Sequence, residues 1–129
     1  MTGGQGMTPT ILIGLAGLMG AAGVVLLAAA AHAAPGAGLD SAGQMLLFHA
    51  LAAVAVAGAL HQGLVFRPLA IAAAIGLVVG AALFSGDIAM RAFAGHRLFP
   101  MAAPTGGVVL IASWLALGAA AVVTLFRAG

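Results

Sequence analysis

Residues 8–34 read TPTILIGLAGLMGAAGVVLLAAAAHAA, a stretch without any aspartate, glutamate, lysine or arginine. It belongs to an uncharged run over 1–39, and further runs without these residue types follow at 41–66, 68–86 and 98–126. A transmembrane helix needs about 20 predominantly apolar residues to cross the hydrocarbon core of a bilayer. The sequence therefore predicts an all-α, polytopic membrane protein, folded as an antiparallel up-down-up-down bundle of four transmembrane helices.

The composition agrees with a chain that has lipid as its solvent. Of 129 residues, 64% are hydrophobic and only 5% are charged, against roughly 25% charged residues in soluble domains. The net charge of +2 comes from scattered arginines, whereas nucleic-acid binding requires clustered basic residues. Because the chain contains no cysteine, disulfides and thiolate metal ligands are excluded. We expect the lipid bilayer to be a partner and nucleic acid not to be one.

Breaks in the apolar pattern set the expected helix limits. Thr8 suits an N-cap, and Pro9 and Pro68 suit the first turn of a helix. Ser41 and Gln44 have the S-x-x-Q spacing of a capping box. These signals predict a disordered lead-in over 1–7 and a single membrane domain over 8–129, with helices at about 9–31, 42–60, 68–87 and 106–126. The segment between the last two helices either lies at the headgroup level or extends the third helix beyond the membrane.

The first apolar segment is expected to remain in the protein. Ala31-His32-Ala33 has the A-x-A form of a signal-peptide cleavage site, but no lysine or arginine precedes Ile11. The apolar run is also longer than the roughly 7–15 residues of a signal-peptide core. We therefore interpret it as a transmembrane helix.

The arginines indicate the orientation of the bundle in the membrane. Arg67 and Arg127 lie on one side of a four-span bundle, and Arg91 and Arg97 lie on the other. The first pair has no acidic neighbours, which favours cytoplasmic placement of both termini under the positive-inside rule.

Small residues are expected to form the contacts between helices. In lipid, glycine allows two helix backbones to approach closely, and such packing drives association. The residues expected at helix contacts are Gly14, Gly17, Gly20 and Gly23 in the first segment, Gly76 and Gly80 in the third, and Trp114 in the fourth.

Antiparallel threading should bring most polar side chains to one end of the bundle. This candidate ligand-binding cluster consists of His32, Gln44, His49, Ser85, Asp87 and Thr105.

The residues of this cluster permit several interpretations. His49 lies deep in the membrane, and a neutral packing histidine that accepts a hydrogen bond from the Trp114 indole is the first interpretation; a ligand or a proton relay is the alternative. His32 together with His49 could hold a metal or haem, although no local ligand spacing supports a metal site. Asp87 and Arg91 are spaced for a helix ion pair, with a substrate-binding carboxylate as the alternative. Ser85 and Gly86 predict a bend and a local hydrogen bond.

Several short motifs in this order resemble a known family. They are Ala31-His32, Gln44 followed by Phe48-His49-Ala50-Leu51, Leu83-Phe84-Ser85-Gly86, and Pro104-Thr105-Gly106-Gly107 with Trp114. This pattern resembles the YgdD-like family of small integral membrane proteins, a domain of unknown function, and is similar to a small transmembrane protein of animal mitochondria. The resemblance implies a four-helix bundle in the bacterial inner membrane, without an established activity. Asp87 and the order Ala103-Pro104-Thr105 depart from the family pattern.

These observations lead to two functional hypotheses. The first is a non-catalytic accessory or stabilising subunit of a larger membrane complex, for example a respiratory one, in contact with other subunits or with copies of itself. The alternative is binding or transport of a small ligand, such as a quinone, lipid, metal or proton, around His32, His49 and Asp87. No acid–base pair or activated nucleophile can be assembled from the sequence, so we expect neither an enzyme nor a bound cofactor.

Overall fold

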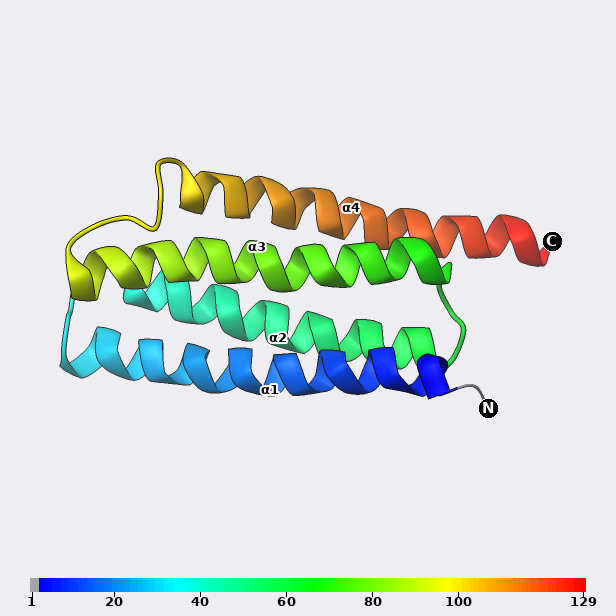
Figure 1. The fold of residues 1–129 in the computed structure, drawn as a ribbon, viewed down its shortest axis with the longest axis horizontal. Coiled ribbons are helices and arrows are strands. Elements are labelled where there is room, and N and C mark those ends of the chain that lie inside the picture. The colour runs from blue at the N-terminus through cyan, green and yellow to red at the C-terminus, as the bar shows by residue number, and fades with distance from the viewer. Residues whose placement is uncertain (1–2) are drawn as a thin grey trace.

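The computed structural model describes residues 3–129 and contains four long helices. They are α1 (Gly3–His32), α2 (Leu39–His61), α3 (Arg67–Ala94) and α4 (Ala102–Ala128). All four are long and apolar enough to cross a membrane. The predicted all-α bundle with four spans is therefore confirmed (Figure 1).

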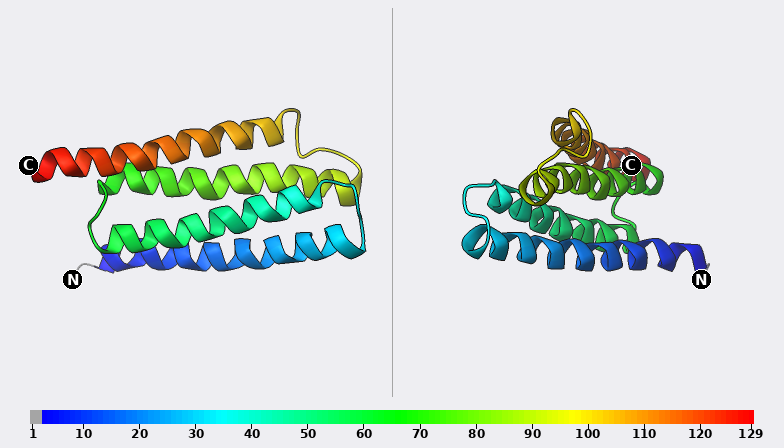
Figure 2. Two further views of the ribbon diagram at one scale, coloured as in Figure 1. Left: turned by 180° about the vertical axis from the view of Figure 1, so that it is seen from behind. Right: turned by 60° about the vertical axis from the view of Figure 1, so that its left-hand side comes forward.

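Consecutive helices run antiparallel, and the N- and C-termini lie at the same end of the bundle (Figure 1). Packing is closest within the hairpins α1–α2 and α3–α4, and contacts between α2 and α3 join the two hairpins. In Figure 2, α1 and α4 lie at opposite edges of the molecule, with α2 and α3 between them. The two outer helices therefore expose most of their surface to lipid.

The start of α1 differs from the expected one. The helix begins at Gly3, so residues 3–7 are helical, and Thr8 lies inside the helix. The prediction of a disordered lead-in is wrong for this part, while residues 1 and 2 lie outside the described residues. In an uncharged segment, helix formation satisfies backbone groups that would be costly to leave unpaired near lipid. A local hydrogen bond from the Thr10 hydroxyl to the Gly6 carbonyl accompanies this turn.

The predicted capping box at the start of α2 does not form. The helix begins at Leu39, and Gly38 is its N-cap, with a φ of 81° and no side-chain capping bond. Ser41 and Gln44 consequently lie within the helix. Glycine readily adopts this left-handed conformation, so the tight turn after α1 determines where α2 begins.

Helix α3 extends into the segment for which the sequence left two alternatives. Helix α3 begins as expected at Arg67-Pro68 and continues to Ala94, where Gly95 ends it in a left-handed conformation. Residues 88–94 of the expected connection thus extend α3, and residues 95–101 link α3 to α4. Helix α4 starts at Ala102, earlier than expected, because a proline at position 104 is tolerated in the first helical turn.

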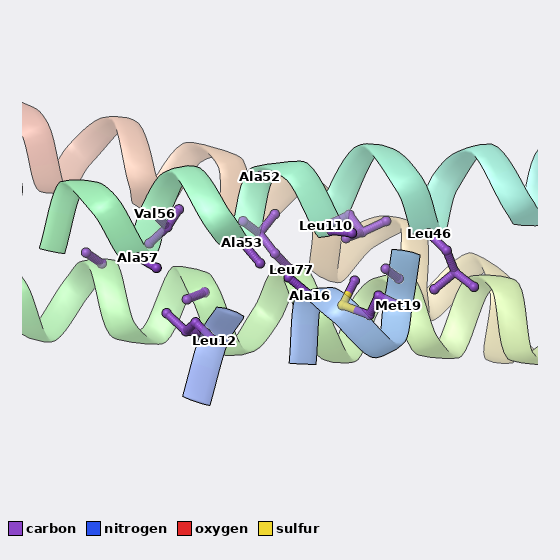
Figure 3. Close-up of a cluster of buried hydrophobic side chains, with 14 of the residues drawn as sticks. Leu12, Ala16, Met19, Leu46, Ala52, Ala53, Val56, Ala57, Leu77 and Leu110 are labelled. Atoms are coloured by element: carbon purple, nitrogen blue, oxygen red, sulfur yellow. The ribbon is translucent and has the colours of Figure 1, made fainter. Parts of the chain in front are cut away.

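The core is formed mainly by α2 and α3, with one stripe from each outer helix. Leu77 and Val56 are almost completely buried at its centre (Figure 3). On α1, the buried side chains follow a spacing of three and four residues, the pattern of a helix seam. The buried residues of α1 are Pro9, Leu12, Ala16, Met19, Gly23 and Leu26.

One pair of glycines brings together the backbones of each hairpin. In α1–α2, a Cβ added to Gly23 would lie 2.9 Å from the Gly43 carbonyl oxygen. In α3–α4, a Cβ added to Gly80 would lie 2.9 Å from the Gly106 carbonyl oxygen. Both hairpins therefore depend on glycine at the point of closest approach.

The glycines expected at helix contacts are only partly the ones that pack. Gly80 lies in a tight contact, Gly76 lies beneath the Ser113 side chain, and Gly20 lies near Ala50. A Cβ added to Gly14 or to Gly17 would meet no atom within 4 Å in the described part of the chain. Their expected role in packing within this chain is wrong, because the seam of α1 passes along a different face.

Candidate functional site

His49 and Trp114 form a polar bridge between α2 and α4. His49 lies ten residues after the start of α2, about 15 Å along the helix axis, and its side chain is only 6% exposed. The Trp114 indole N–H donates to His49 Nε2 at 3.2 Å, which confirms the predicted contact. The two rings meet edge to face, with centroids 5.9 Å apart.

The second ring nitrogen of His49 is also occupied. Nδ1 lies 2.7 Å from the Met45 carbonyl oxygen, one helical turn earlier. A carbonyl oxygen can only accept and an indole N–H can only donate. These two contacts require the neutral imidazole tautomer with its proton on Nδ1. Both ring nitrogens are therefore hydrogen-bonded within the helix bundle.

Ser85 joins α3 to α2. Its hydroxyl donates to the Ala42 carbonyl oxygen at 2.8 Å, and its side chain is 1% exposed. The sequence predicted a local hydrogen bond for Ser85, and this prediction is wrong. Because small residues let α2 and α3 approach closely, the hydroxyl reaches the neighbouring backbone instead.

Asp87 anchors the connection between α3 and α4. Its side chain is fully buried, and Oδ1 accepts a hydrogen bond from the Leu98 backbone N–H at 3.0 Å. Oδ2 lies 3.6 Å from an Arg91 guanidinium nitrogen, which confirms the predicted ion pair. This oxygen has no hydrogen-bond partner among the described residues. Asp87 thus holds residues 95–101 against the end of α3.

Replacing Asp87 should loosen this connection. In Asp87→Ala, the amide hydrogen of Leu98 loses its acceptor, and we expect its exchange with solvent to become about tenfold faster. In Asp87→Asn, the side-chain carbonyl can still accept this bond, so exchange should stay close to that of the original protein. Hydrogen–deuterium exchange in detergent micelles measures both rates. Exchange of the Leu98 amide in Asp87→Ala at the rate of the original protein would show that Asp87 does not anchor the segment.

The other members of the predicted cluster do not join these contacts. His32, Gln44 and Thr105 are exposed on the helix surface. Instead of one polar site, the structure has separate contacts at His49, Ser85 and Asp87. Within residues 3–129, no group of three histidine, aspartate or glutamate side chains could hold a metal ion.

Sequence reasoning missed Gly43 and Gly106, which complete the two glycine contacts. Both lie four residues into the second helix of a hairpin. The sequence feature that could have predicted these contacts is a glycine early in a membrane helix. Because the sequence holds 20 glycines, this feature does not distinguish Gly43 and Gly106 from the others.

The fold and these contacts define a small, multi-pass helical membrane protein whose buried polar side chains connect one helix to another or to its own backbone. The family described as "Protein of unknown function (DUF423)" matches residues 19–107. The chain belongs to this family. No curated protein and no solved structure matches the chain.

Proposed function

We propose that this protein is a non-catalytic accessory or stabilising subunit of a larger complex in the bacterial inner membrane, with both termini in the cytoplasm. The observation that carries the proposal is the pairing of His49. Both ring nitrogens of this deeply buried histidine have structural partners, Met45 and Trp114. His49, the buried side chain best suited to ligand binding or proton transfer, thus holds helices together.

The surfaces of the outer helices support an interaction role. On α1, Gly14 and Gly17 point away from the other helices, and on α4 Gly118 has open space around it. Large apolar side chains such as Leu18 and Leu115 flank these glycines and are 71% exposed. Outward-facing small residues allow a helix of another subunit to approach closely.

Site-specific photo-cross-linking in cells tests this proposal. A photoreactive residue at Leu18 on α1 or at Leu115 on α4 should yield a discrete cross-linked protein. The same protein should co-purify with the chain in mild detergent, and two differently tagged copies distinguish a homo-oligomer from a second subunit. A photoreactive residue at Leu77, which is buried in the core, is the matched control and should cross-link only within the chain. Recovery of a monomer with lipid adducts alone would refute the proposal.

A cavity at the Asp87 end favours a second candidate, the binding of a small ligand. It has a volume of about 570 Å³ and lies between the α1–α2 connection and α3. Its wall includes Ser41 and Arg91, and Arg91 pairs with Asp87. Replacing Arg91 with glutamine should abolish binding of a small ligand in this cavity. The helix content, measured by circular dichroism, should stay unchanged. Unaltered binding would argue against this site.

A further inference from the structure

A separate apolar groove runs between α1 and α3. It has a volume of about 310 Å³ and is lined by aliphatic side chains of both helices, among them Ile11, Leu12, Leu15, Ile71, Ala74 and Ile75. Leu12 and Ala74 are almost fully buried and form its floor, while Ile75 is 57% exposed at its rim. The short side chain of Ala74 leaves the space that a longer residue would fill.

One end of this groove is polar. Thr8 of α1 belongs to the lining, and an Arg67 guanidinium nitrogen lies 3.4 Å from the Thr8 hydroxyl. Arg67 is the first residue of α3, so this end lies where the helix leaves the hydrocarbon. The groove is therefore apolar within the membrane and has the Arg67 guanidinium and the Thr8 hydroxyl at its interfacial end.

The distribution of charge favours an anionic occupant. Arg67 begins α3 at this end of the bundle, near the termini (Figure 1). Both carboxylate side chains of the chain are elsewhere: Asp40 is in the first turn of α2 and Asp87 near the far end of α3. An arginine near the membrane surface attracts anionic lipid headgroups by about 1 kcal/mol.

We propose that this groove binds an anionic phospholipid. One acyl chain lies between α1 and α3, and the phosphate lies against Arg67 and Thr8. A guanidinium has five N–H donors, so two of them can bind phosphate oxygens in a bidentate manner while the others keep the contacts of Arg67 within the chain, including the one with Thr8. From Thr8 to Leu15 the groove follows α1 for about 10 Å, a length that accommodates the upper part of an acyl chain. This site lies at the opposite end from Asp87 and does not depend on the proposed accessory role.

Native mass spectrometry of the full chain tests the headgroup contact. The protein is incubated in detergent with equal amounts of phosphatidylglycerol and phosphatidylcholine, and the retained lipid is identified. We expect a preference for phosphatidylglycerol that falls about fivefold to tenfold in Arg67→Gln. Arg127→Gln is the matched control. It removes the same charge at the same end of the bundle, but the Arg127 guanidinium lies over the Phe66 ring and not against Thr8. Its lipid preference should be unchanged.

A second pair of variants tests the groove itself. Ile75→Trp should fill the rim and reduce retention of both lipids, while Ile111→Trp, on the exposed surface of α4, should not. Circular dichroism confirms that each variant is folded. The proposal is overturned if the original protein shows no lipid preference, if both arginine variants lose it equally, or if Ile75→Trp retains lipid normally. A photoreactive residue at Ile75 that captures a protein instead of a lipid would also overturn it.

Discussion

Replacing Gly106 with alanine is expected to lower the free energy of unfolding by about 3 kcal/mol, at the upper end of the usual range for overpacking. The added Cβ would lie 2.7 Å from both the Gly80 carbonyl oxygen and the Phe84 backbone nitrogen. These are backbone atoms of α3 and cannot rotate away. Helices α3 and α4 must therefore separate, and the close packing that holds membrane helices together is lost over the length of the hairpin.

The neighbouring glycine provides a matched control. A Cβ added to Gly107 meets no other atom within 4 Å among the described residues, and alanine favours a helix over glycine by about 1 kcal/mol. Gly107→Ala should therefore be as stable as the original protein or slightly more stable. Unfolding by sodium dodecyl sulfate, followed by circular dichroism, measures both variants. Equal stability of the two would mean that the Gly80–Gly106 contact does not hold the hairpin together.

The second large effect is expected from the bridge between His49 and Trp114. In Trp114→Phe, His49 Nε2 loses its donor, and in His49→Leu, the indole N–H loses its acceptor. Each change should lower the free energy of unfolding by about 1–2 kcal/mol, the range for side-chain hydrogen bonds between membrane helices. Because the bridge connects the two hairpins, the loss should appear mainly as weaker association of the α1–α2 hairpin with the α3–α4 hairpin.

A double-mutant cycle isolates this contact from the other effects of each change. With His49→Leu and Trp114→Phe combined, the coupling energy should be about 1 kcal/mol. Phe48→Leu is the control, since Phe48 is adjacent to His49 but 59% exposed, and it should not couple to Trp114. A coupling energy near zero for the His49–Trp114 pair would show that the hydrogen bond contributes nothing to stability.

Part of the site could be predicted from the sequence because it depends on spacing along one helix or on depth in the membrane. Asp87 and Arg91 are one helical turn apart, so their ion pair follows from the helix alone. His49 and Trp114 lie at similar depths in α2 and α4, which run in the same direction, and each buried polar ring atom needs a hydrogen-bond partner. The contact of Ser85 with the Ala42 carbonyl could not be predicted in this way, because every residue of α2 offers a carbonyl and only the packing angle selects one.

The sequence alone determined that the chain crosses the membrane four times, since charged residues are costly in hydrocarbon and their positions divide the chain into four apolar runs. Which face of each helix meets another helix follows only from how the folded helices pack. On α1, Gly14 and Gly17 face outward while Gly23 contacts α2, although all three lie in the same apolar setting. In water, polarity would separate a buried face from an exposed one. In a bilayer both faces are apolar, so shape complementarity between backbones makes the choice.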